Sequence, residues 1–204
     1  MRPNCANCLR PKITCICHLV SEVDTAIDVL ILQHPLEVTE TKGTARLLHL
    51  SLPNSHLQVN EIFEENVFLS SKHSILLYPT TSEDCSLGIL SPPELNPVIL
   101  NDLKNVRLII IDGTWRKSRK ILIKNPYLQT LPRLILNDLP AGQYTIRKAR
   151  KPHQLSTLEA TCAALTQLER STQKFEPIMQ SFTEFNAFIA SKIKFRDLAG
   201  VFIA

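Results

Sequence analysis

The sequence lacks any apolar run near the ~20 residues that a membrane-spanning helix requires, so no membrane span is expected. No apolar stretch follows Arg2 at the N-terminus, which argues against a secretory signal and makes the cytoplasm the expected location. Internal repeats and low-complexity segments are also missing, which argues against a repeat array. These absences leave a globular, non-membrane protein as the expected class.

The 204 residues are enough for one domain with a sizeable core, and the hydrophobic content of 44% is ordinary. The net charge of +4 conceals an asymmetry. Residues 1–100 contain 6 lysines and arginines against 11 acidic residues, whereas residues 101–204 contain 17 against 8. A localised positive field suits a polyanion such as nucleic acid, although a solvated surface would have the same composition.

Four of the six cysteines fall within thirteen residues: Cys5, Cys8, Cys15 and Cys17. The intervening segment 9–14 can fold back, so four thiolates can surround one tetrahedral Zn²⁺. Two local disulfides are the alternative, which a reducing compartment disfavours. Because protein ligands would fill all four positions, the metal is expected to be structural. Cys85 and Cys162 lack partners at metal spacing and are expected in the core.

Apolar runs rich in branched residues predict buried strands at residues 26–33, 74–78 and 106–111, with a shorter one at 133–136. Helical patterns follow at residues 44–50, 115–124 and about 156–170, and a last helix begins near Phe175. Strands that alternate with helices predict an α/β fold with a parallel sheet. The proline-rich connection 80–105 is too long for a simple link and is expected to be functional or mobile.

The strongest candidate site follows the strand at 106–111. In open α/β sheets, ligands bind at the carboxyl ends of strands, and Asp112 lies at such an end. Its carboxylate can act as a general base or can cap the following turn. Trp115, the only tryptophan, can stack on a ligand or can anchor its helix in the core. His34, at another strand end, is expected to be a structural hydrogen-bonding residue.

The helix at 115–124 is amphipathic: Trp115, Ser118, Ile121 and Leu122 share the side that is predicted to pack on the sheet. The opposite side carries a basic stripe, defined as Arg116, Lys117, Lys120 and Lys124. No glutamate within the helix pairs with these charges, which favours a phosphate-binding role over a merely solvated face. Further along, Ser156 and Glu159 have the spacing of a capping box, which explains Glu159 without a catalytic role.

Several motifs together resemble the DTW-domain family, the tRNA-uridine aminocarboxypropyltransferases. These motifs are the cysteine cluster with Arg10-Pro11, Gln33–Glu37 with Thr44–Leu47, Leu77-Tyr78-Pro79, Asp112–Trp115, Tyr144–Lys148 and Leu155–Ala160. The resemblance covers roughly residues 2 to 170. Residues 39–43 depart from the family pattern because they are more acidic.

The resemblance implies a SPOUT-like α/β fold with a C-terminal trefoil knot, on residues 25–204, preceded by a four-cysteine zinc-binding segment at 1–24. It further implies that S-adenosylmethionine donates a 3-amino-3-carboxypropyl group to N3 of a tRNA uridine, with variable-loop position 47 as the expected target. Methylthioadenosine is the leaving group and is released as the second product. The partners implied are tRNA and S-adenosylmethionine, with zinc as a structural metal.

The resemblance also assigns roles to residues. Asp112 would be the catalytic base. The donor would contact Leu77, Tyr78, Pro79, Thr114, Trp115, Tyr144, Ile146, Ser156 and Thr157. RNA phosphates would contact Arg116, Lys117, Lys120, Arg147, Lys148, Arg150 and Lys151. Two alternatives remain open on the sequence: a SPOUT-type RNA methyltransferase, and a zinc-containing RNA-binding protein without catalytic activity.

Overall fold

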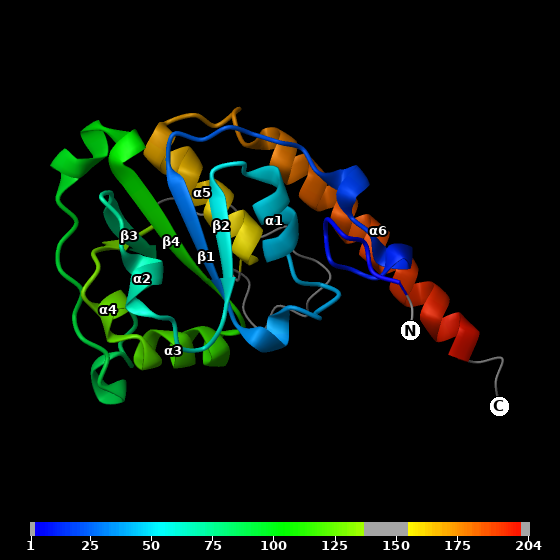
Figure 1. Ribbon diagram of the computed structural model, residues 1–204, viewed down its shortest axis with the longest axis horizontal. Coiled ribbons are helices and arrows are strands. Elements are labelled where there is room, and N and C mark those ends of the chain that lie inside the picture. Colours follow the sequence, from blue (N-terminus) through cyan, green and yellow to red (C-terminus); the bar gives the residue numbers. More distant parts are fainter. Residues whose placement is uncertain (1–2, 137–154, 201–204) are drawn as a thin grey trace.

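A computed structural model describes residues 3–136 and 155–200 of the chain, with side chains up to residue 192 (Figure 1). Its centre is one parallel five-stranded sheet in the order β2-β1-β4-β3-β5. The strands are β1 (Asp28–Gln33), β2 (Ser55–Val59), β3 (His73–Leu77), β4 (Val106–Asp112) and β5 (Arg133–Leu134). Because all pairings are parallel, the carboxyl ends of the strands meet at one edge of the sheet.

Helices cover both faces of this sheet (Figure 1). They are α1 (Ala45–Ser51), α2 (Glu65–Phe68), α3 (Trp115–Lys124), α4 (Pro126–Gln129), α5 (Thr157–Glu169) and α6 (Glu176–Gly200). Short 3-10 turns of three to five residues occupy Lys12–Thr14, Cys17–Leu19, Pro35–Glu37, Cys85–Leu87, Pro97–Asn101 and Leu103–Asn105. None of the described helices is both long and apolar enough to span a membrane.

The alternation of side chains along the strands produces two hydrophobic cores. In β4, Leu108 and Ile110 face a core that contains residues of α1, α5 and α6, whereas Ile109 and Ile111 face a core with residues of α3 and α4. Burial on both faces explains why the central strands consist almost entirely of branched apolar residues. The fold is therefore a three-layer α/β arrangement, and the α/β class with a parallel sheet is the one that the sequence predicts.

The predicted strands and main helices are confirmed, with shifts of a few residues at their ends. The helix at 115–124 has the predicted bounds, and Ser156 and Glu159 form the predicted capping box at the start of α5. The sequence pattern did not indicate β2, α2 or α4. β2 is an edge strand in which only Ser55 is buried, and the two helices are single turns of four residues.

The N-terminal segment lies along α6 (Figure 1). Ile16, Leu19 and Val23 share the core that contains Phe182 and Phe185 of α6, a helix that the sequence predicts to pack on the domain. The segment thus packs on the main body through apolar side chains as well as through its cysteines. Its separation from the rest at residue 24 stays a prediction.

Candidate active site and metal centre

Asp112 is the last residue of β4, and its side chain is fixed by two neighbouring elements. Its Oδ2 accepts a hydrogen bond from Nε2 of Gln33 at 2.9 Å, and its Oδ1 accepts one from Oγ1 of Thr157 at 2.6 Å. Gln33 is the paired residue at the end of β1, and Thr157 is the first residue of α5. Asp112 is only 5% exposed. Sequence reasoning gave Gln33 no role of its own, although a polar residue at the end of a buried strand is a usable signal.

These contacts bear on the alternative that Asp112 merely caps the turn after β4. The N-cap residue of α3 is Thr114, whose side chain makes no cap hydrogen bond. Two of the Asp112 contacts join β4 to β1 and α5, which a role limited to the turn would not require. The turn favours glycine at position 113, because a Cβ there would lie 3.1 Å from Cβ of Lys117, a tighter contact than most side chains make. Glycine therefore lets α3 start close to the end of β4.

A cavity of about 340 Å³ lies at the carboxyl ends of β3, β4 and β5, within the usual range for small-ligand sites. Six of the nine expected donor-contacting residues line it: Leu77, Tyr78, Pro79, Trp115, Ser156 and Thr157. Thr114 is exposed and does not line it, and Tyr144 and Ile146 lie outside the described residues. Asp112 does not line the cavity itself but holds Thr157, which does.

Two aromatic rings form one wall of this cavity. Tyr78 and Trp115 meet edge to face, with ring centroids 5.9 Å apart. Trp115 is 47% exposed, so the prediction that it packs on the sheet with Ser118, Ile121 and Leu122 is wrong. It lies at the first position of α3, directly after the strand end, where the sheet no longer covers it. Behind Tyr78, the buried Arg133 guanidinium lies 5.5 Å from the ring and bonds Asp84 at 2.8 Å.

The start of α5 forms the opposite side of the cavity. Oγ of Ser156 accepts from the Glu159 backbone N–H at 3.2 Å, and the Glu159 carboxylate accepts from the Ser156 N–H at 2.8 Å. Glu159 is thus used in the cap, as the sequence predicts. The N-terminus of a helix favours nearby negative charge, and the Asp112 carboxylate lies beside this one.

The proline-rich connection 80–105 contains three of the 3-10 turns. It lines a second cavity of about 960 Å³, which shares Thr80, Leu134 and Ile135 with the first. Cys85 is exposed on this connection, so its expected place in the core is wrong, whereas Cys162 is buried as expected. Burial raises the pKa of the Cys162 thiol to about 12, which disfavours the reactive thiolate form.

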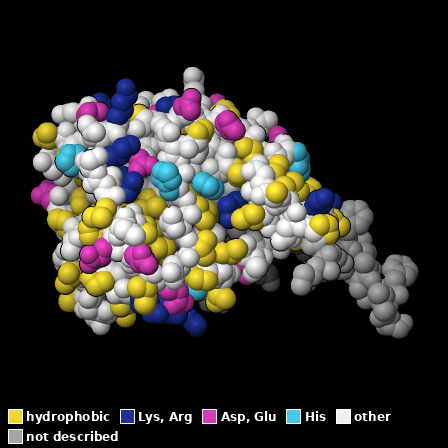
Figure 2. Space-filling model, viewed as in Figure 1, with side chains coloured by type: hydrophobic (Ala, Val, Ile, Leu, Met, Phe, Trp, Pro, Cys, Tyr) yellow, Lys and Arg dark blue, Asp and Glu magenta, His cyan; other side chains and the backbone are white. Residues whose placement is uncertain are grey.

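The three lysines of the basic stripe on α3 are paired with carboxylates from other elements. Nζ of Lys117 lies 2.8 Å from Oε1 of Glu37, and Lys120 and Lys124 both contact Glu61, at 2.7 and 2.8 Å. Over α3 in Figure 2, basic and acidic side chains accordingly lie next to each other. As the sequence indicates, α3 itself contains no acidic partner for these lysines, but carboxylates far away in the sequence pair with them. This pairing weakens the argument for a phosphate-binding role. Arg116 is exposed, and Arg147, Lys148, Arg150 and Lys151 lie outside the described residues.

Glu61 is the centre of this charge cluster. Hydrogen bonds from Lys120 and Lys124 lower the pKa of the Glu61 carboxyl to about 2, so it is ionised throughout the neutral range. Its Oε1 also lies 2.9 Å from Nε2 of His34. Nδ1 of His34 accepts from the Leu36 N–H at 3.1 Å, so both ring nitrogens have partners. His34 is buried and has the structural role that the sequence predicts for it.

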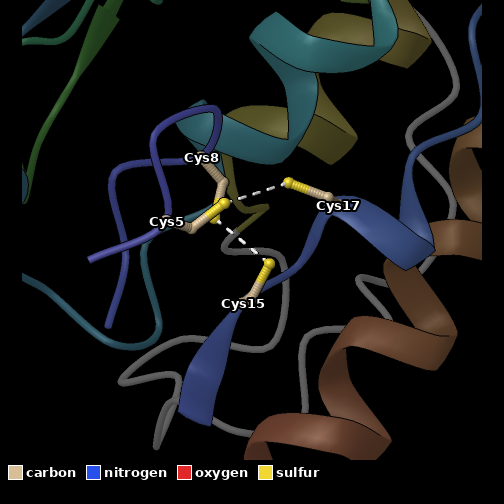
Figure 3. Close-up of side chains that lie close together, drawn as sticks. All are labelled: Cys5, Cys8, Cys15 and Cys17. Atoms are coloured by element: carbon tan, nitrogen blue, oxygen red, sulfur yellow. Dashed lines mark hydrogen bonds between the residues drawn. The ribbon is translucent and has the colours of Figure 1, made fainter. Parts of the chain in front are cut away.

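The four N-terminal cysteines converge on one point (Figure 3). Their Sγ atoms all lie within 4.8 Å of one another, with Cys5–Cys17 at 3.6 Å and Cys8–Cys15 at 3.8 Å. Ligands at the usual Zn–S distance in a tetrahedron are separated by about 3.8 Å, so the geometry fits a zinc site with four thiolate ligands. All six cysteines are free, which excludes the disulfide alternative in this structure.

The electrostatics of the cluster also suit a metal. Backbone hydrogen bonds from Cys8 and Asn7 lower the pKa of the Cys5 thiol to about 6, whereas burial raises the pKa of Cys17 to about 12. Without a cation, four thiols so close together cannot all ionise. A bound cation would release their protons, and its affinity would therefore fall as the pH is lowered.

A parallel α/β sheet with a ligand-sized cavity and a buried carboxylate at its carboxyl edge defines an α/β protein with a candidate small-molecule site. The cluster of four cysteines adds a candidate structural metal centre. The chain belongs to the DTW domain family, since this domain matches residues 2–190.

Several curated relatives are named as tRNA-uridine aminocarboxypropyltransferases. The tRNA-uridine aminocarboxypropyltransferase 2 of Macaca fascicularis is 27% identical over 198 residues, which cover 92% of this chain and 63% of the relative. The Mus musculus protein of that name is 28% identical with the same coverage. The Drosophila melanogaster protein is 28% identical over 82% of this chain and 67% of its own length. The chain thus spans 63% of the first two relatives. No solved structure matches it.

Proposed function

We propose that this protein transfers the 3-amino-3-carboxypropyl group of S-adenosylmethionine to N3 of a tRNA uridine and releases methylthioadenosine. The observation that carries the proposal is the hydrogen bond between Asp112 and Thr157 at the edge of the cavity. It joins a buried carboxylate to the wall of a ligand-sized space. The names of the relatives support this choice of reaction.

The chemistry needs a base. Uridine N3–H is a weak acid, and N3 becomes nucleophilic when its proton passes to a carboxylate oxygen of Asp112. Oδ1 and Oδ2 of Asp112 each accept one of the described hydrogen bonds, which fix the orientation of the carboxylate. N3 then attacks the γ-carbon of the donor. The carbon–sulfur bond breaks with its electron pair on sulfur, which yields neutral methylthioadenosine.

Orientation decides which carbon is transferred, because a sulfonium has three carbons open to attack. Tyr78 and Trp115 offer aromatic surface to a flat base, either adenine or uridine. Ser156 and Thr157, at the start of α5, would hold the polar amino acid moiety of the donor. The proposal retains a SPOUT-like topology with a C-terminal knot, although residues 137–154 lie outside the described ranges.

The cysteine cluster would hold a structural Zn²⁺ through Cys5, Cys8, Cys15 and Cys17. With four protein ligands and no open coordination position, this metal would stabilise the fold and would take no part in the reaction. Arg116 and the basic segment 147–151 would contact tRNA phosphates. Lys117 and Lys120 would contact phosphates only after breaking their ion pairs with Glu37 and Glu61.

The reaction is tested with S-adenosylmethionine labelled separately on the methyl and carboxypropyl carbons. We expect carboxypropyl label in tRNA, methyl label in methylthioadenosine, and 3-(3-amino-3-carboxypropyl)uridine in digests of the product. A matched transcript with cytidine at variable-loop position 47 should stay unlabelled. Methyl label in the RNA would instead identify a methyltransferase. If neither the methyl nor the carboxypropyl label enters the RNA, only the RNA-binding alternative remains.

Glu61→Gln is expected to strengthen tRNA binding, because it removes the carboxylate that pairs with Lys120 and Lys124 while keeping an oxygen for His34. The plot of log K against log salt should become steeper by roughly one to two units, as for one or two additional phosphate contacts. Filter binding of tRNA over a salt series measures this. The control, Glu65→Gln, removes an exposed charge four residues further along the chain and leaves the contacts of Glu61 with Lys120 and Lys124 in place. Equal slopes for the two variants would contradict the role given to α3.

A further inference from the structure

Arg10 lies between the two cysteine pairs and makes contacts that a metal loop does not need. Its carbonyl oxygen accepts a hydrogen bond from the Cys5 N–H at 2.7 Å, so its backbone closes the loop that carries Cys5 and Cys8. The preceding residue, Leu9, has a left-handed backbone with φ of 59°. Folding of the cysteine cluster therefore fixes the point from which the Arg10 side chain starts.

The guanidinium of Arg10 reaches a turn that is more than 30 residues away in the sequence. It donates to the carbonyl oxygens of Thr41 and Gly43, both at 2.8 Å. It also lies 5.2 Å from the ring centroid of the buried Phe185 in α6. The turn is tight, since the Gly43 N–H bonds the Glu40 carbonyl at 2.9 Å and a Cβ on Gly43 would lie 3.2 Å from that oxygen. Arg10 thus clamps this turn against the metal segment.

The turn leads directly to the candidate active site. Its next residue, Thr44, is buried, and its Oγ1 accepts from the Leu158 N–H at 3.3 Å in the first turn of α5. The neighbour of Leu158 is Thr157, which donates to Asp112. A continuous series of contacts therefore runs from the cysteine loop through Arg10, the 41–44 turn and the start of α5 to the candidate base.

We propose that Arg10 is a positioning residue that couples the metal segment to the wall of the candidate active site. With the cysteine loop folded, Arg10 holds residues 41–44 in place, and Thr44 then holds the first turn of α5 beside Asp112. Loss of the metal or of the guanidinium releases this turn. The coupling stands on the described contacts, and its effect on donor binding rests on the proposed function.

Hydrogen–deuterium exchange on the metal-loaded chain tests the coupling directly. Arg10→Met keeps most of the stem but removes both hydrogen bonds, so exchange in residues 41–48 and 157–161 should accelerate by about tenfold. The metal content should stay at that of the wild type. Chelation of the wild type should accelerate the same two segments. Arg10→Lys keeps the charge but cannot reproduce the planar two-carbonyl contact, so an intermediate effect is expected.

Two further variants separate positioning from general loosening. Lys12→Met removes a cation from the same segment without touching the turn and should leave both segments unchanged. Thr44→Val removes only the hydroxyl that bonds Leu158, and should accelerate residues 157–161 but not 41–43. If Arg10→Met does not fold, Arg10→Lys gives the same comparison. Unchanged exchange in the Arg10 variants, or equal effects of Lys12→Met, overturns the proposal.

Calorimetric titration with S-adenosylmethionine adds a functional measurement. The donor Kd should rise by about tenfold in Arg10→Met, because a smaller fraction of molecules has the wall of the site in place. If Arg10→Met binds the donor as tightly as the wild type does, the coupling has no effect on donor binding, and this functional part of the proposal is contradicted. Absence of donor binding by the wild type would refute the proposed function, while the exchange data would still decide the coupling.

Discussion

Asp112→Asn is expected to slow aminocarboxypropyl transfer by about 10²- to 10⁴-fold and to leave tRNA binding intact. Asparagine has the same shape and can still accept from Thr157, but its amide cannot take the uridine proton. Its Nδ2 would face Nε2 of Gln33, and a flip of the Gln33 amide would restore that hydrogen bond. The fold is therefore expected to survive, and single-turnover transfer with filter binding of tRNA measures both effects.

A matched control exists at the other end of the sheet. Asp28 begins β1, is 7% exposed, and bonds Nε of Arg107 at 2.7 Å. Asp28→Asn also removes a buried carboxylate, so it should lower the melting temperature but leave the transfer rate nearly unchanged. Thr157→Val removes the hydroxyl that orients Asp112 and should slow transfer by a smaller factor than Asp112→Asn does. Wild-type transfer by Asp112→Asn would exclude Asp112 as the base.

Removal of the metal has the second large expected effect. Structural zinc contributes roughly 10–16 kcal/mol of apparent binding free energy in small zinc domains, and part of that energy should stabilise this chain. The N-terminal segment also places Ile16 and Leu19 in the main core, so its loss would expose apolar surface. Chelation, or Cys8→Ser at the buried ligand, should lower the melting temperature by about 10 °C or more.

Cys85→Ser is the matched control for the metal prediction, because Cys85 is exposed and lies outside the cluster. It should change neither the melting temperature nor the metal content. Elemental analysis is expected to find about one thiophilic metal per wild-type chain and less than half of that in Cys8→Ser. Full metal content in Cys8→Ser would show that the four cysteines do not form one site.

Local patterns were read correctly from the sequence. The buried strands are branched apolar runs because both of their faces are covered, and the start of α5 is a capping box within four residues. The cysteine cluster is also local, with its four members within thirteen residues. Asp112 could be singled out because it follows a buried strand, and ligands of open α/β sheets bind at the carboxyl ends of strands.

Contacts between distant residues could not be read in the same way. Glu37 and Glu61 lie 80 and 59 residues before Lys117 and Lys120, with which they pair, and nothing in the helical pattern of α3 indicates them. Periodicity also placed Trp115 on the buried side, because it averages over a whole helix and ignores where the sheet ends. Gln33 and Arg10 contact partners at sequence separations that local patterns do not cover.

The order of the strands has a consequence for how the chain reaches its folded state. β4 lies between β1 and β3 but is synthesised after both of them. Before β4 emerges, β1 and β3 therefore have no shared partner, and the sheet becomes continuous only when β4 inserts between them. Such long-range parallel pairing is slow to form. The strand that carries the candidate base thus joins the two halves of the sheet, and molecules interrupted before residue 106 expose apolar strand edges that chaperones would have to protect.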